Sequence, residues 1–401
     1  MPRRTVAAVA LAVALLAVAA PASAATPRSA EYWLTDYGVT AAWSTTKGAG
    51  VTVAVIDTGI GRPADLAGAV VGGTDFSGRG SADGRTPVGS KDPQHGTLVA
   101  SVLAARGGAG GMVGVAPEAS LLAVSIGTAA DVDDSDDEIA KAVRWSVDHG
   151  ASVISMSLSR GTKDWPRSWD DAFLYAAGHD VVVVAAAGNR AGGEDEVGAP
   201  ATMPGVLAVG GLTTSGAASS GSSTQGITIA VAAPAERLVG ALPGGGYVYW
   251  SGSSGATPIV AGVVALVRAA HPDLDAANVI ERVIATAHDA GAAGVDPLYG
   301  YGRVDAESAV RASVPRVDAN PLGSLADWVR TYRRADGAPP TVTATPVPVA
   351  SGSAAVPAIE RDGTAWRAWG IPTVLVALLV AALVAAAVAM ALRVKRSRRS
   401  G

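Results

Sequence analysis

The sequence contains no cysteine, and aromatic residues make up only 5% of its 401 residues. The absence of cysteine excludes disulfide bonds, thiolate metal sites and a cysteine nucleophile. With so few aromatic side chains, a core must be filled mainly by alanine and valine, which suits parallel strands covered by helices. The net charge of -4 gives no excess of basic residues, so we expect no nucleic-acid partner.

The N-terminus has the features of an export signal. Arg3 and Arg4 precede an apolar run over residues 6–20, and Ala22-Ser23-Ala24 follows as a cleavage site with small residues. The run is short for a membrane span. We therefore expect residues 1–24 to be a signal peptide.

The C-terminus has the features of a single membrane span. Residues 371–392 are apolar and carry no charge, and this run is long enough for one transmembrane helix. Trp366 and Trp369 precede this run, and the tail 393–401 contains five basic residues. Because positively charged flanks stay in the cytoplasm, the sequence predicts a cell-membrane protein with a cytoplasmic tail and its main domain outside.

The region between these ends predicts one α/β domain over residues 51–314. A short extension, 25–50, precedes it, and a Pro-rich spacer, 315–370, follows it. Apolar runs indicate strands, helical periodicity indicates helices, and the two alternate along the chain. This order predicts a mostly parallel sheet with helices on both faces. The expected strands are 51–56, 121–125, 151–158 and 181–187. A short helix is expected after His95, and further helices are expected at 135–149, 259–270 and 328–334.

Three short motifs supply the groups of a nucleophilic hydrolase. Asp57-Thr58-Gly59 provides a carboxylate, His95-Gly96-Thr97 an imidazole, and Gly252-Ser253-Ser254 a hydroxyl. Serine is a weak nucleophile unless an imidazole takes its proton, and the imidazole needs a carboxylate to orient it. The order Asp, His, Ser along the chain is one of the known orders of such a triad.

Each of these residues alone has a simpler interpretation. Asp57 before Thr-Gly could be a turn residue, and Asn189 after Ala187-Gly188 could be another. A serine at the start of a helix could be its N-cap, a part that Ser253 could also play. We favour the catalytic interpretation because the motifs occur together.

The three motifs resemble the active-site motifs of the subtilase family. The match continues at 114–117, at 187–189 and at 300–306, and covers roughly residues 32–314. The resemblance implies a subtilisin-like α/β fold and a serine endopeptidase without a cofactor. It also implies that Asn189, with the backbone N–H of Ser254, donates to the oxyanion.

Substrate binding is expected at two strand ends. Residues 155–159 resemble the family's Ser-Leu-Gly edge strand, which pairs with extended peptides. The expected substrate-binding residues are Ser155, Ser157, Leu158, Ser159, Ala187 and Gly188. Ser159 replaces the family's glycine, from which we expect a restricted P1 residue of small or medium size.

Two acidic runs call for a decision on metal binding. The run 131–138 matches no EF-hand spacing, and its Ser135 and Glu138 have the spacing of a helix capping box. We expect no metal ligands there, and binding of a structural calcium ion is the alternative. Residues 194–196 are expected to be a solvated acidic loop beside the substrate site.

The whole arrangement is most similar to the mycosins, subtilases associated with type VII secretion. The signal peptide, the short extension, the Pro-rich spacer and the single span carry this resemblance. It implies a peptide substrate, a lipid bilayer around one C-terminal span, and association with a type VII secretion membrane complex. A structural role in that complex with secondary proteolysis is the alternative, and an esterase of the same fold is a third.

Overall fold

The computed structural model describes residues 26–127 and 135–333. The expected signal peptide, the end of the Pro-rich spacer, the span 371–392 and the basic tail lie outside the described residues. So does part of the acidic run, residues 131–134.

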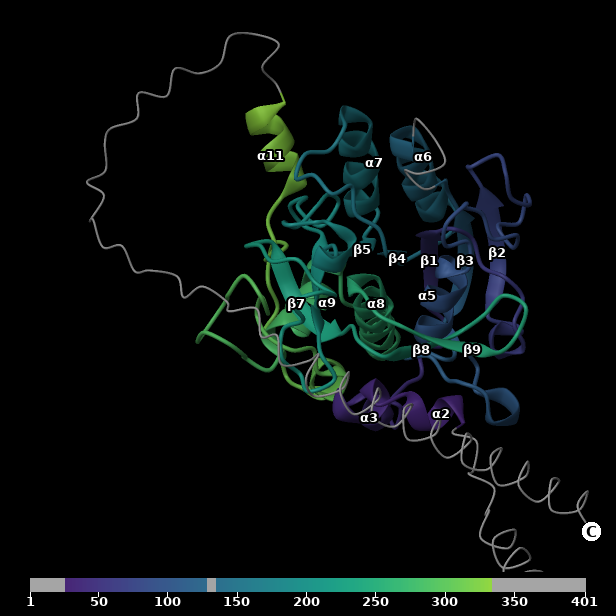
Figure 1. Ribbon diagram of the computed structural model, residues 1–401. Helices are drawn as coiled ribbons and strands as arrows, with labels where there is room; N and C mark the ends of the chain where they lie inside the picture. The colour runs from purple at the N-terminus through teal and green to yellow at the C-terminus, as the bar shows by residue number, and fades with distance from the viewer. Residues whose placement is uncertain (1–25, 128–134, 334–401) are drawn as a thin grey trace, which may run out of the picture. The chain divides into compact units, whose positions relative to one another are not determined.

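A parallel sheet organises the described part of the chain. It has seven strands in the order β2-β3-β1-β4-β5-β6-β7, and each pairing is parallel, as the sequence predicted (Figure 1). The strands are β1 (Thr52–Asp57), β2 (Val70–Asp75), β3 (Ser120–Ser125), β4 (Val153–Met156), β5 (Val182–Ala186), β6 (Leu207–Leu212) and β7 (Ile229–Pro234).

Helices cover both faces of this sheet. One face carries α5 (His95–Ala104), α8 (Ser253–Ala270) and α9 (Ala276–Ala285), and the other carries α6 (Ser135–Asp148) and α7 (Arg167–Gly178) (Figure 1). The shorter helices are α2 (Pro27–Ala30), α3 (Trp33–Asp36), α4 (Val39–Ala42), α10 (Ala306–Arg311) and α11 (Leu325–Tyr332), with the 3₁₀ turns Ala64–Leu66, Gly108–Gly110 and Arg190–Gly192.

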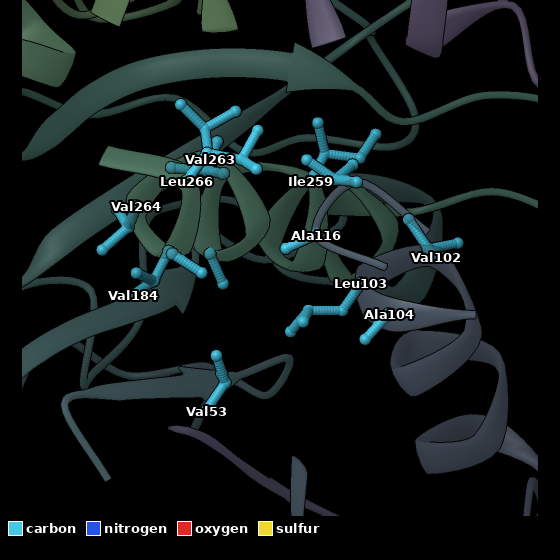
Figure 2. Close-up of a cluster of buried hydrophobic side chains, with 14 of the residues drawn as sticks. Val53, Val102, Leu103, Ala104, Ala116, Val184, Ile259, Val263, Val264 and Leu266 are labelled. Carbon is cyan, nitrogen blue, oxygen red and sulfur yellow. The ribbon is translucent and has the colours of Figure 1, made fainter. Parts of the chain in front are cut away.

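Two cores result, and β1 contributes to both. Val53 and Val55 pack into the core below α5 and α8, while Ala54 and Ile56 pack into the core below α6 and α7. Because alternate residues of a strand point to opposite faces, a strand covered on both sides must be apolar throughout. Figure 2 shows the first core, in which Val53 and Val184 of the sheet lie near side chains of α5 and α8.

The structure differs from the predicted elements in two places that shape the site. Helix α8 begins at Ser253, ahead of the predicted apolar run 259–270, and Ser254 lies at its N-terminus, as the sequence predicted. A two-stranded antiparallel hairpin, β8 (Leu238–Ala241) and β9 (Tyr247–Trp250), precedes it and was not predicted. The hairpin turns through Pro243 and three glycines and leads directly into α8.

Within residues 26–127 and 135–333, α8 is the one helix long and apolar enough to cross a membrane. Its side chains are buried against the sheet, so this length and composition reflect a core helix.

The N-terminal segment, residues 26–50, packs against the sheet domain. Trp33 is fully buried in the core, and the indole N–H of Trp43 donates to the carbonyl of Val115 at 2.8 Å. The hydroxyl of Tyr32 donates to the carbonyl of Glu236, just before β8, also at 2.8 Å. The segment is therefore part of the folded unit.

A buried carboxyl group anchors this segment. The side chain of Glu31 is fully buried, and its Oε1 accepts the backbone N–H of Val113 at 2.7 Å. Burial raises the pKa of Glu31 to about 8, although the Val113 N–H and the Arg28 guanidinium act against it and the Asp65 carboxylate adds to it. Docking of the segment is thus linked to a proton on Glu31.

This linkage predicts a pH-dependent stability. The folded state binds the proton of Glu31 more tightly than the unfolded chain does. The contribution of this proton to the free energy of unfolding is therefore complete below pH 4.5 and is lost as the pH rises through about 8. Between these limits we expect the free energy of unfolding of the wild type to fall relative to that of Glu31→Gln, by up to about 1.4 kcal/mol per pH unit. Denaturant unfolding of the full chain at several pH values measures this difference.

The exposed Glu307→Gln, which removes a surface carboxylate paired with Arg311, is the control and should leave the pH dependence unchanged. Parallel curves for the wild type and Glu31→Gln would show that Glu31 is ionised in the folded protein and would contradict the assignment.

Candidate active site

Asp57 lies at the carboxyl end of β1, where the buried strand reaches the edge of the sheet. The residue is only 5% exposed, and its Oδ1 accepts the backbone N–H of Thr58 at 2.7 Å. Its two oxygens lie 2.8 and 3.0 Å from Nδ1 of His95. A carboxylate and an imidazole distant in the sequence are therefore directly paired.

Thr58 holds this pair together by joining β1 to the start of α5. Its hydroxyl donates to the carbonyl of Pro93 at 3.0 Å and accepts the backbone N–H of Gly96 at 2.9 Å. Glycine is required at position 96, because a Cβ there would lie 2.4 Å from the carbonyl oxygen of Gly59. The His-Gly sequence thus lets α5 approach the strand end closely enough for His95 to reach Asp57.

The electrostatics of the pair suit a proton acceptor. Burial by itself lowers the pKa of His95, but the charge and hydrogen bond of Asp57 outweigh it and the pKa is raised. The contact with Asp57 assigns the proton of neutral His95 to Nδ1, which leaves Nε2 as the acceptor. A quarter of the His95 side chain is exposed, so this side of the ring is accessible.

Ser254 is the second residue of α8, and its position depends on a proline. Pro258 lies four residues further along the helix and has no N–H, so it cannot bond the carbonyl of Ser254. That carbonyl instead accepts the hydroxyl of Ser157 at 2.8 Å. In return, the hydroxyl of Ser254 donates to the carbonyl of Ser157 at 3.2 Å. The start of α8 is thereby fixed to the end of β4.

Asn189 follows β5 and lies against the start of α8. Its Oδ1 accepts the backbone N–H of Ser253 at 2.7 Å, which orients the amide and turns Nδ2 away from that contact. Ser253 also bonds Gly188 through its hydroxyl, at 3.0 Å to the carbonyl and 3.1 Å from the N–H. The Asn189 amide is therefore held against Ser253, the residue before Ser254.

Trp250, the last residue of β9, lies between His95 and the start of α8. Its ring lies 5.7 Å from the His95 ring, edge to face. On its other side, a Cβ on Gly255 would lie 3.4 Å from the indole and 2.3 Å from Leu238. The absence of a side chain at Gly255 therefore makes room for Trp250 and Leu238. Sequence reasoning missed Trp250, although it stands only four residues before Ser254.

The expected substrate-binding residues separate into two groups. Ser155 and Ala187 are fully buried, so their side chains do not face the surface. The other four lie where the strand ends reach α8. Ser157 and Gly188 bond to Ser254 and Ser253, while Leu158 and Ser159 are partly exposed.

No cluster of three or more potential ligand side chains forms a metal site among the described residues. The part of the acidic run at 131–134 lies outside them. Helix α6 begins at Ser135, as its sequence predicted, and Glu138 accepts the N–H of Gly127 at 2.7 Å.

The assembled groups are a base with a free nitrogen, a hydroxyl and an amide donor at one edge of the sheet. A hydroxyl beside free helix N–H groups suits a reaction in which negative charge develops on an oxygen. Such a set of groups can carry out acyl transfer. In this structure the Ser254 hydroxyl is bonded to the carbonyl of Ser157 and not to His95.

Comparisons with known proteins agree with this geometry. The model of the subtilase family of peptidases matches residues 48–302. Mycosin-4 of Mycobacterium tuberculosis is 36% identical over 321 residues, which is 68% of this chain and 68% of that protein. Subtilisin E of Bacillus subtilis is 35% identical over 271 residues, 66% of each chain.

Solved structures give the same result. A crystal structure of MycP1 with its N-terminal propeptide removed has a TM-score of 0.62 at 29% identity, covering 72% of this chain and 98% of that one. A structure of the MycP3 protease from the type VII (ESX-3) secretion system has a TM-score of 0.62 at 30% identity, covering 73% and 90%. The chain belongs to the subtilase family and is a subtilisin-like serine protease related to the mycosins.

Proposed function

We propose that the chain is a membrane-anchored, extracytoplasmic endopeptidase that cleaves peptide bonds through Asp57, His95 and Ser254. The observation that carries this proposal is the direct pairing of Asp57 with Nδ1 of His95. The anchoring of Ser254 at the start of α8, beside Asn189, supports it.

The first step forms an acyl-enzyme. The hydroxyl of Ser254 turns from the Ser157 carbonyl toward Nε2 of His95, which takes its proton as the oxygen attacks the peptide carbonyl. Asp57 stabilises the imidazolium that forms. His95 then gives the proton to the leaving amine, and the peptide C–N bond breaks.

The oxyanion of the tetrahedral intermediate needs donors that are already in place. We assign Nδ2–H of Asn189 and the backbone N–H of Ser254 to this role. The Asn189 amide is oriented by Ser253, and the N–H of Ser254 lies in the first turn of α8, where it has no partner within the helix.

Hydrolysis of the acyl-enzyme repeats these steps with water. Water attacks the ester while His95 takes a proton from it. His95 then gives this proton to Ser254 Oγ when the ester bond breaks. The proposed steps use protein groups and water alone, so we propose no catalytic cofactor.

The cellular setting follows from the chain ends and the relatives. The predicted signal peptide, 1–24, and the apolar run 371–392 with its basic tail, 393–401, support a catalytic region outside the membrane. Residues 25–50, 51–314 and 315–370 would be the extension, the peptidase domain and the spacer. Similarity to a protease from the type VII (ESX-3) secretion system supports a role with such a membrane complex.

Replacement of the proposed nucleophile tests the mechanism. Ser254→Ala should abolish both labelling by a fluorophosphonate and hydrolysis of a peptide substrate by isolated membranes. The matched control is Ser251→Ala. The hydroxyl of Ser251 accepts the N–H of Arg237 in the described structure, and its removal should leave labelling and hydrolysis as in the wild type. Undiminished labelling of Ser254→Ala would place the nucleophile elsewhere. Secretion that persists in Ser254→Ala cells would favour the structural alternative for the cellular role.

Trp250 should support the base through its contact with His95. Trp250→Ala opens the space beside the imidazole, and loss of an aromatic contact of this kind predicts a fall in kcat/KM of roughly two- to tenfold. Trp250→Phe keeps a smaller aromatic ring at this position, and the indole N–H that it removes has no partner among the described residues, so it should keep most activity. Initial rates on one peptide substrate measure both.

The matched control for these variants is Tyr249→Ala, at an exposed position on the same strand, which should leave kcat/KM unchanged. A Trp250→Ala enzyme as active as this control would refute the supporting role.

A further inference from the structure

Glu194 occupies an unexpected position in the acidic loop 194–196. The sequence predicted a solvated loop, and Asp195 and Glu196 are indeed exposed, with Glu196 paired to Lys163 at 2.6 Å. Glu194 is instead partly buried, and its Oε2 accepts the backbone N–H of Asn189 at 2.6 Å. One carboxylate of the loop is therefore turned toward the proposed active site.

The carboxylate of Glu194 lies beside two chain segments, the one that follows β4 and the one that follows β5. A Cβ on Gly188, after β5, would lie 2.9 Å from Oε2 of Glu194. A Cβ on Gly161, beyond the end of β4, would lie 3.8 Å from Oε1. Both positions lack a side chain, so the carboxylate is bordered on these two sides by backbone.

Both segments are hydrogen-bonded to the start of α8. Ser157 exchanges hydrogen bonds with Ser254, and Gly188 exchanges them with the neighbouring Ser253. A substrate side chain that enters between the segments next to the nucleophile would therefore point along them toward Glu194.

The space between the segments is also narrow. A Cβ on the buried Gly198 would lie only 2.3 Å from the hydroxyl oxygen of Ser159. The same hydroxyl accepts the N–H of Gly161 at 3.1 Å. A Ser159 hydroxyl at this place disfavours broad aromatic or branched side chains more than an unbranched one.

The charge of Glu194 has no cationic partner among the described residues. Lys163 is paired with Glu196, and Arg160 is paired with Asp136. Arg190, which precedes Glu194 in the same loop, forms no ion pair with it in the described part of the chain. A partly buried carboxylate without a counter-ion favours a ligand that supplies one.

We propose that Glu194 makes this enzyme select lysine or arginine as the P1 residue, immediately before the cleaved bond. The inference rests on the proposed peptidase function and names its substrate class. It replaces the expectation of a small or medium P1 residue, which considered Ser159 alone, and it keeps the exclusion of aromatic side chains.

The test uses the full-length protein and peptidyl aminomethylcoumarin substrates that differ only at P1. Norleucine, which has the unbranched chain of lysine without the ammonium group, isolates the effect of charge. We expect kcat/KM for P1 lysine or arginine to exceed that for norleucine by about tenfold or more, and P1 glutamate and phenylalanine to be poor.

Two variants assign the effect to the carboxylate. Glu194→Gln retains an oxygen that can accept the N–H of Asn189, so it should lower kcat/KM for P1 lysine and arginine far more than for norleucine and remove most of the preference. Glu196→Gln lies two residues further on and should keep the wild-type profile.

Two results would overturn the inference while the proposed function stands. In the first, fluorophosphonate labels Ser254 but the wild type cleaves norleucine as well as lysine. In the second, Glu194→Gln lowers all substrates by the same factor, which would mean that Glu194 only positions Asn189. The proposed function itself fails, and the inference with it, if Ser254 is not labelled and no substrate is cleaved.

Discussion

The hydrogen bond between Asp57 and His95 is the interaction on which the rest of the site depends. It joins the end of a central strand to the first residue of α5, and it selects the tautomer whose free nitrogen can accept a proton. Two small neighbours make it possible, because Thr58 bonds both segments and Gly96 allows their close approach. Without this pairing, burial would lower the pKa of His95, whereas the Asp57 carboxylate raises it.

The serine is placed by a second constraint, the missing N–H of Pro258. A regular helix would use the carbonyl of Ser254 internally, but here it bonds the hydroxyl of Ser157. The beginning of α8 is consequently tied to the sheet at a position where backbone N–H groups are free. The buried remainder of α8 fixes this position by packing against the sheet, as Figure 2 illustrates.

Sequence reasoning could predict what is local. The apolar run before Asp57, the helix after His95 and the alternation of elements follow from periodicity, and the family follows from spaced motifs. The position of Ser254 at the start of α8 was expected as well. The regular helix through Gly255 and Pro258 was not, because both residues are poor helix formers and the hydrogen bonds to Ser157 override that preference. The inward turn of Glu194 was also missed, because nothing in an acidic loop tells which carboxylate will meet a backbone N–H.

The most direct measurement of the central claim is a crystal structure of the enzyme after reaction with a peptidyl phosphonate. The account predicts phosphorus bonded to Ser254 Oγ, with one phosphonyl oxygen within hydrogen-bond distance of Asn189 Nδ2 and the Ser254 N–H. It also predicts that His95 stays bonded to Asp57 and directs Nε2 at the adduct. An adduct on Ser254 with His95 detached from Asp57, or with Asn189 facing away from the phosphonyl oxygen, would contradict it.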